Sequence, residues 1–234
     1  MRVTLIAATK LTPAWHALAG RLNYHPSGWG DMELLTEFSG RACYQSWDRP
    51  NPDTEDTRDY CTATVIDKQH GSIAEHSSVS FYVEGVSRSL THELVRHRHL
   101  SFSQLSQRFV SENDAVVTIP PAFACDDDAI NILSDVEHYT KNAYCSLVDL
   151  ATNKGLPRKQ AREAARAALP NATATSLVVT GNLRAWRDVL GRRLHPSADA
   201  EIRQLSFLLL RELNALAPSL FADLIEEYAD DLNA

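Results

Sequence analysis

Short stretches in which apolar and polar residues alternate predict the strands of this chain. The clearest is 77–84, where Val79, Phe81 and Val83 would face inward and the residues between them outward. Residues 2–8 alternate in the same way. Two further short strands are predicted at 115–120 and 176–180, the first of them ended by a pair of prolines. The strands are separated by long stretches of a different periodicity.

Apolar residues that recur every three or four positions predict helices between these strands. The predicted helical ranges are 31–45, 54–68, 87–98, 127–152, 157–169, 183–194, 198–216 and 219–232. In the first helix, one stripe carries Leu34, Leu35, Phe38 and Ala42. We expect Asp31 and Ser87 to cap two of the helices, and Gly85 to end the strand before Ser87. Residues 47–57 read as a loop, and 99–108 as a loop or short helix.

This order of elements favours the α+β class. A few separated strands would form a central, mostly antiparallel sheet flanked by two helical groups. No linker divides the chain, so we expect one domain over residues 1–234. No apolar run reaches membrane length, and the first residues make a poor signal peptide. Four scattered cysteines without metal spacing suit free thiols in a reducing compartment. We therefore expect a cytoplasmic protein.

The charge is acidic overall but its positive part is clustered. The formal net charge is -7, which argues against a long polyanionic partner. Three ranges, 88–108, 158–166 and 184–193, are rich in arginine and carry a single acid each. Such islands suit a small anionic ligand. For any one arginine, exposure to water on a helix surface is the simpler interpretation.

The segment 96–108 carries the most distinctive chemistry. It reads Arg-His-Arg-His-Leu-Ser-Phe-Ser-Gln-Leu-Ser-Gln-Arg. Arginine forks match phosphates and the edges of planar heterocycles, while hydroxyl and amide groups suit a base or a sugar. A solvated surface loop would usually contain an acid or a lysine, and this segment contains neither. A nucleotide is therefore a better candidate ligand than water alone.

Two nearby histidine patterns could represent a metal site or a turn. His92 and His97 resemble the zinc motif HExxH, but they are five residues apart and would point about 140° from each other on a helix. We therefore predict no metal site. The run from His70 to His76 places two imidazoles and a carboxylate before a strand. It could be a functional turn or a hydrogen-bonded structural one.

The segment 96–108 resembles the signature RHRxxSxxxxSxR of the flavin-dependent thymidylate synthases. All six fixed positions match, at one spacing: Arg96, His97, Arg98, Ser101, Ser106 and Arg108. Residues 40–47, 70–76, 165–173 and 180–193 also resemble parts of the family, so the similarity covers roughly 35–220. Enzymes of this family convert dUMP to dTMP with methylenetetrahydrofolate, FAD and NADPH. They are homotetramers whose active sites lie between subunits.

The resemblance implies two sets of ligand-binding residues. The dUMP site would comprise Glu93, Leu94, Val95, Arg96, Gln104, Leu105, Ser106, Gln107, Arg108, Arg166 and Arg193. The FAD site would comprise His70, Ser72, Arg96, His97, Arg98, Gln104, Asn182, Leu183, Arg184 and Asp188. By the family pattern, Arg193 is the catalytic residue, placed against the pyrimidine edge. It would favour the enolate-like form of the base, deprotonated at N3, that attacks the methylene carbon.

Two positions depart from the family pattern. Ser197 stands four residues beyond Arg193, where the family has a histidine, and His195 lies nearby. Asp188 stands where the family tends to carry a neutral or basic polar residue. These departures keep a second interpretation open, in which the chain is a nucleotide-binding, non-catalytic or regulatory homologue of the same fold. A third interpretation is a helical assembly protein whose basic islands are subunit contacts.

No cysteine lies near the signature, and no base is evident to activate Ser106 as a nucleophile. We therefore predict chemistry without a covalent enzyme link. Replacing all four cysteines by serine or alanine should leave dTMP formation measurable in a steady-state assay. Loss of turnover in a variant that still folds would contradict the electrostatic mechanism.

Overall fold

The computed structural model describes residues 1–27, 30–47, 51 and 54–233. Its strands are β1 (Arg2–Ala8), β2 (Ser78–Ser87), β3 (Ser101–Gln104) and β4 (Ala174–Asn182). Its α-helices are α1 (Pro13–Arg21), α2 (Asp31–Tyr44), α3 (Thr57–Cys61), α4 (Arg88–Leu94), α5 (Asp127–Asn153), α6 (Arg158–Ala165), α7 (Leu183–Arg193), α8 (Ala200–Leu216), α9 (Ala222–Glu227) and α10 (Ala229–Asn233). The predicted loop at 47–57 falls partly outside the described residues.

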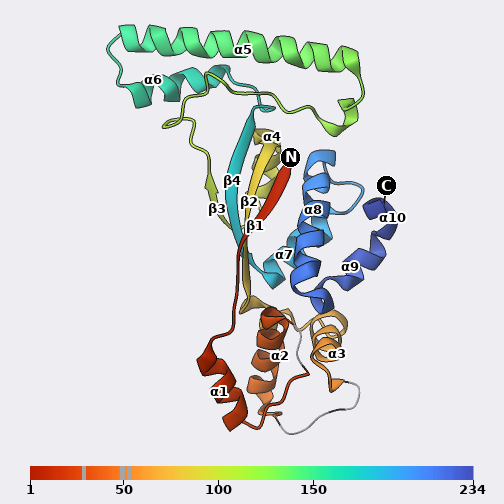
Figure 1. Ribbon diagram of the computed structural model, residues 1–234. Helices are drawn as coiled ribbons and strands as arrows, with labels where there is room; N and C mark the ends of the chain where they lie inside the picture. Colours follow the sequence, from red (N-terminus) through yellow and green to blue (C-terminus); the bar gives the residue numbers. More distant parts are fainter. Residues whose placement is uncertain (28–29, 48–50, 52–53, 234) are drawn as a thin grey trace.

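Within the described residues, the strands form one antiparallel sheet in the order β1-β2-β4-β3. One face of it carries Phe81 and Val83 of β2 and Val179 of β4, all almost fully buried. Helices α4, α7 and α8 contact the sheet, and the core lies between them and this face. The α5–α6 pair lies beyond one end of the sheet, and α1, α2 and α3 lie beyond the other (Figure 1). The predicted α+β class and antiparallel sheet are confirmed.

Two backbone irregularities shift the predicted strand patterns. Gly85 does not end β2: it forms a bulge with φ of 69°, and pairing with β4 continues to Ser87. In β1 the register shifts between Leu5 and Ala7, so Ala8 rather than Ala7 is partly buried and packs on the core. A bulge of this kind adds one residue to the strand. The side chains after it therefore point to the opposite face of the sheet from the one that simple alternation predicts.

Several other boundaries also differ from the prediction. The segment 99–108 contains β3, where a loop or short helix was expected, and 115–120 contributes only an isolated bridge between Val117 and Thr173. Helix α4 ends at Leu94 rather than near Arg98. The helix predicted at 54–68 begins at Thr57 and continues from Thr62 to Asp67 as a π-helix. After it, the left-handed residue is Gln69, with φ of 56°, instead of Gly71.

The C-terminal half agrees more closely with its periodicity. Helix α5 spans nearly the predicted range, and α7 and α8 fall within one or two residues of theirs. The range 157–169 divides into α6 and a 3-10 turn from Arg166 to Ala168. The range 219–232 divides into a 3-10 turn at Pro218–Leu220, α9 and α10. Every described helix is too short or too polar to cross a lipid bilayer.

The buried side of α2 is polar, which the predicted apolar stripe did not anticipate. Glu37 is 1% exposed and accepts hydrogen bonds from Arg41 Nε at 2.6 Å and Thr57 Oγ1 at 2.7 Å. Glu33, equally buried, accepts from the backbone and hydroxyl of Ser219. The helix is capped by Gly30, and Asp31 is its first residue instead of its cap. Buried charges are tolerated here because each has a partner.

This network predicts a large cost for removing one charge. Arg41→Met would leave the carboxylate of Glu37 buried without its cation, and should lower the free energy of unfolding by about 3 kcal/mol. Urea denaturation followed by circular dichroism measures the change. The matched control is Lys141→Met, which breaks the more exposed Lys141–Glu137 pair at the same spacing on α5. It should cost about 0.5 kcal/mol or less, and equal costs for the two variants would contradict the account.

Candidate functional site

Helix α4 presents one apolar side to the core and one polar side to solvent. Ser87 caps it by accepting a hydrogen bond from the backbone of Leu90 at 2.9 Å, as predicted. Val86, Leu90 and Leu94 are at most 2% exposed. Because these residues recur at four-residue steps, the intervening polar residues of the helix face outward together.

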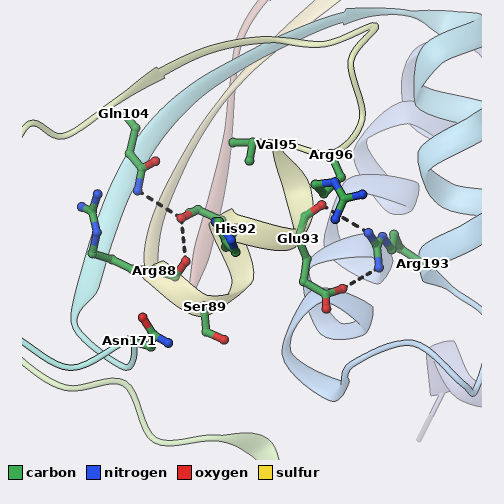
Figure 2. A pocket seen from close by; sticks show the side chains of 10 residues that line it. Arg88, Ser89, His92, Glu93, Val95, Arg96, Gln104, Asn171 and Arg193 are labelled. Carbon is green, nitrogen blue, oxygen red and sulfur yellow. Dashed lines mark hydrogen bonds and ion pairs between the residues drawn. The ribbon is translucent and has the colours of Figure 1, made fainter.

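The polar side of α4 forms one wall of a cavity of about 550 Å³, here called the α4 cavity. It is lined by Arg88, Ser89, Thr91, His92, Glu93, Val95, Arg96, Gln104, Asn171 and Arg193. Arg88 and Gln104 lie at one side of the helix, and Arg96 and Arg193 at the other (Figure 2). Three guanidinium groups and a single carboxylate line it, so the cavity favours an anionic ligand.

Arg193 is held in place at this wall by two residues. Its Nη1 donates to Glu93 Oε2 at 2.5 Å and its Nη2 to the backbone oxygen of Glu93 at 3.2 Å. Its Nε donates to His97 Nε2 at 3.0 Å. All three guanidinium nitrogens are therefore engaged, and the group is fixed before any ligand arrives.

His97 is a buried imidazole that stays neutral at ordinary pH. Its ring is 8% exposed, and its Nδ1 lies 3.6 Å from Asp188 Oδ2. Burial lowers the pKa of His97 below 6.5, and the charge of Arg193 lowers it further, while Asp188 opposes both. A neutral ring is required here because Nε2 must accept the hydrogen bond from Arg193.

Gln104 is oriented by the sheet. It is the last residue of β3 and pairs in register with Leu177 of β4. Its Nε2 donates to Thr91 Oγ1 at 3.1 Å and lies 3.4 Å from Thr175 Oγ1. Because both contacts use the amide nitrogen, the amide oxygen is the group that can accept from a ligand N–H.

Three further cavities continue from the α4 cavity along α7, and together they are called the α7 groove. The first, of about 310 Å³, shares Arg96 and Arg193 with the α4 cavity. The second, of about 370 Å³, shares Asp188 and three other residues with the first. The third, of about 380 Å³, shares Arg184 with the second. The cavities are therefore adjacent to one another, and the first of them adjoins the α4 cavity at Arg96 and Arg193.

The donors along the α7 groove suit a ligand with phosphates. Its second cavity contains two carboxylates that already have arginine partners: Glu75 bonds Arg184 at 2.5 Å, and Asp188 bonds Arg192 at 2.8 Å. A Cβ at Gly71 would lie 3.2 Å from Arg184 Nε, so the 70–76 turn approaches this arginine closely, and a larger residue would require the arginine side chain to shift. The arginines along the groove favour an anionic ligand.

Most of the predicted ligand residues lie along these two features. Glu93, Val95, Arg96, Gln104 and Arg193 line the α4 cavity. The predicted cofactor residues His70, Ser72, Arg96, His97, Arg98, Asn182, Arg184 and Asp188 line the α7 groove. Leu94 and Leu183 are at most 1% exposed and belong to the core, so their side chains point away from both.

The remaining predicted residues lie outside both cavity linings. They are Leu105, Ser106, Gln107, Arg108 and Arg166. Arg108 Nε is 2.7 Å from Glu163 Oε2 of α6, and Arg166 begins the turn that follows α6. One chain therefore brings together only part of the predicted nucleotide site.

The family pattern missed several cavity residues, namely Arg88, Ser89, Thr91, His92 and Asn171 of the α4 cavity and His99, Ala185 and Arg192 of the groove. The helical phase of α4 could have found two of them. Arg88 and His92 are four residues apart, and both share the polar face with Arg96. Asn171 is brought in by the loop before β4, which local periodicity does not reveal.

The histidine and cysteine positions bear on other chemistry. His92 lines the cavity, whereas His97 packs against Arg193 and Asp188, so the two do not converge. Cys61 is fully buried, and burial raises its pKa above the usual range of a thiol. The described residues that line the α4 cavity include no cysteine. Alanine is the better replacement for Cys61, because the core would have to bury a serine hydroxyl.

A preformed cation at an anion-binding cavity, joined to a long polar groove, defines a nucleotide-binding enzyme that uses a second ligand. Comparison with known proteins narrows this class. The family model described as "Thymidylate synthase complementing protein" matches residues 27–219. A flavin-dependent thymidylate synthase of Mycobacterium tuberculosis (strain H37Rv) is 51% identical over 196 residues, which cover 81% of this chain and 78% of that protein. The chain belongs to the flavin-dependent thymidylate synthase family.

Two further comparisons agree. A flavin-dependent thymidylate synthase of Mycobacterium sp. (strain KMS) is 46% identical over 234 residues, which cover 95% of this chain and 89% of that protein. A crystal structure of thymidylate synthase X from Helicobacter pylori with FAD and dUMP has a TM-score of 0.65 and 19% identity. The match covers 95% of this chain and 98% of that one, and at this identity it supports the fold.

The environment of His97 predicts a pH dependence of stability. Its pKa is lower in the folded chain than in the unfolded one, so the unfolded chain binds the proton more readily as pH falls below 6.5. The free energy of unfolding should therefore be insensitive to His97 above pH 6.5 and should fall as pH drops below it. The groups that set this shift are Arg193, Asp188 and Arg192 on α7.

Urea denaturation across this pH range measures the effect. The control is His97→Gln, whose amide oxygen can still accept from Arg193 but cannot titrate. Its free energy of unfolding should fall less steeply below pH 6.5 than that of the unaltered chain. If the free energy of unfolding falls equally steeply in both proteins, the pKa of His97 is not lowered by folding.

Proposed function

We propose that the chain makes dTMP from dUMP, with methylenetetrahydrofolate as methylene donor and FAD and NADPH as the reducing system. Relatives that are 46% to 51% identical and are named flavin-dependent thymidylate synthases support this reaction. The crystal structure of the Helicobacter pylori protein with FAD and dUMP supports the two ligands. The single observation that carries the proposal is the position of Arg193, which lines both the α4 cavity and the adjoining groove.

In this proposal dUMP occupies the α4 cavity. Glu93, Val95 and Arg96 line its wall, and the amide oxygen of Gln104 is placed to accept from a sugar hydroxyl. The guanidinium of Arg193 faces the pyrimidine edge and favours its enolate-like, N3-deprotonated form. No cysteine is needed, because the increased electron density at the base replaces activation by a thiolate.

FAD occupies the α7 groove in this proposal, with His70, Ser72, Asn182 and Arg184 toward one end and His97 and Arg98 toward the other. Bound reduced FAD supplies the hydride that completes the methyl group, and NADPH restores the reduced flavin. Arg184 and Arg192 are the cations placed along the groove for its phosphates.

A second copy of the chain would complete the site, which supports a homotetramer with active sites between subunits. Ser106, Arg108 and Arg166 lie outside the linings of both cavities and are not buried, so a neighbour's nucleotide can reach them, whereas Gln107 is only 6% exposed. Helix α5 also exposes large apolar side chains, among them Ile132, Tyr139 and Leu150. Such a surface is typical of a face that packs against another subunit.

The two departures from the family pattern leave the proposed chemistry in place. Ser197 Oγ is 2.7 Å from His195 Nδ1 on an exposed turn, and neither residue lines the α4 cavity or the α7 groove. Asp188 is neutralised by Arg192. A purely regulatory nucleotide-binding role is therefore not favoured. The free thiols of the described cysteines fit a reducing compartment such as the cytoplasm.

Arg193→Ala tests the proposal. It should lower kcat for dTMP formation about a hundredfold or more, because an aligned charge in the active site is lost. The assay contains dUMP, FAD, NADPH and methylenetetrahydrofolate, and omission of any one should abolish turnover. The matched control is Arg187→Ala, an arginine of the same helix that pairs with Asp223 away from both cavities and should retain activity.

The absorbance of bound flavin distinguishes a failure to bind FAD from a failure to form dTMP. Both variants should keep bound FAD and should bleach on adding NADPH. A folded, unaltered chain that cannot be loaded with FAD, or that bleaches without forming dTMP from dUMP, would sink the proposed function. Full activity of Arg193→Ala would show that Arg193 has no part in the proposed reaction.

A further inference from the structure

A row of four polar side chains links α4 to the middle of α7. Glu93 holds Arg193, the Nε of Arg193 donates to His97, and the far side of His97 faces Asp188. The row begins in the α4 cavity and ends in the α7 groove, where Asp188 lines the first two cavities.

The hydrogen positions in this row follow from the donor capacity of arginine. A guanidinium has donors only, so His97 Nε2 must be the acceptor in its 3.0 Å contact with Arg193. The neutral ring then carries its proton on Nδ1. That nitrogen lies 3.6 Å from Asp188 Oδ2, and the carboxylate is the acceptor placed to orient it.

Asp188 is itself held so that one oxygen is left for the imidazole. Arg192 Nε and Nη2 donate to Oδ1 at 3.0 and 2.8 Å, and Oδ2 faces His97. Asp188 and Arg193 lie on the same helix, five residues apart, and the imidazole packs between them from the segment after α4.

We propose that Asp188 is a positioning residue for the reaction: it fixes the imidazole of His97, which in turn holds the guanidinium of Arg193 against the nucleotide. This inference rests on the proposed function. Without the carboxylate, the ring can turn or place its proton on Nε2, and Arg193 then loses its Nε acceptor. Glu93 still holds the other two nitrogens, so the guanidinium tilts instead of leaving the cavity.

Asp188→Ala is the first test, in the holoenzyme with saturating FAD. We expect kcat/KM for dUMP to fall severalfold, because the carboxylate that faces His97 Nδ1 at 3.6 Å is lost. The Kd for FAD, measured by quenching of flavin fluorescence, should not increase, because the variant removes a negative charge from the groove that holds the phosphates. Asp188→Asn should recover part of the activity, because its amide oxygen can still accept from Nδ1.

The control for a purely structural effect is Asp223→Ala. Asp223 of α9 forms a bidentate pair, at 2.9 and 2.7 Å, with Arg187 of α7, the helix that also carries Asp188. This pair lies away from both cavities. Its loss should lower the melting temperature but leave kcat/KM for dUMP unchanged. An equal loss of activity in Asp223→Ala and Asp188→Ala would show that loosening α7 is sufficient, and would overturn the proposal.

A double-mutant cycle with His97→Ala tests whether His97 transmits the effect. In the His97→Ala background, Asp188→Ala should cause no further loss of kcat/KM, because the intermediary is already absent. Multiplicative losses would overturn the proposal, as would a loss that follows a weakened Kd for FAD. If the unaltered holoenzyme forms no dTMP, the proposed function itself fails, which is a different result from activity that survives Asp188→Ala.

Discussion

The hydrogen bonds of Arg193 are the interaction on which the rest of the site depends. They join the last residue of α7 to Glu93 near the end of α4 and to the imidazole of His97. One of the bonds goes to a backbone oxygen in the last turn of α4, a part of a helix that attracts cations. A guanidinium fixed by three nitrogens needs little rearrangement when charge develops on a bound base, and this is the physical basis of the proposed catalysis.

The sheet makes this contact possible. β2 and β4 are antiparallel neighbours, and each leads directly into a helix on the same face. Helix α4 starts where β2 ends and α7 starts where β4 ends, so the two helices begin at opposite ends of the sheet and their last turns meet above it. Val83 and Val179, buried beneath them, fix the register of the two strands and therefore the meeting point. The cavity and the groove lie on either side of that contact.

The site residues that could be predicted from the sequence are those marked by a pattern of neighbouring residues. The signature at 96–108 is contiguous, and the buried face of α4 follows from four-residue steps. Strand β3 was missed because it is a four-residue edge strand of mainly polar residues, stabilised by pairing with β4 rather than by a pattern of its own. The buried side of α2 was misjudged because Glu33, Glu37 and Arg41 recur like a solvated face. Their burial depends on partners distant in sequence, such as Ser219 for Glu33 and Thr57 for Glu37. Asn171 came from a loop that periodicity cannot place.

The most direct measurement is a crystal structure of the chain with dUMP and FAD. The account predicts the pyrimidine edge in the α4 cavity against the guanidinium of Arg193, with His97 Nε2 still accepting from its Nε. It also predicts the flavin in the α7 groove, at the end that adjoins the α4 cavity at Arg193. A pyrimidine bound away from Arg193, or a flavin outside the groove, would contradict the central claim.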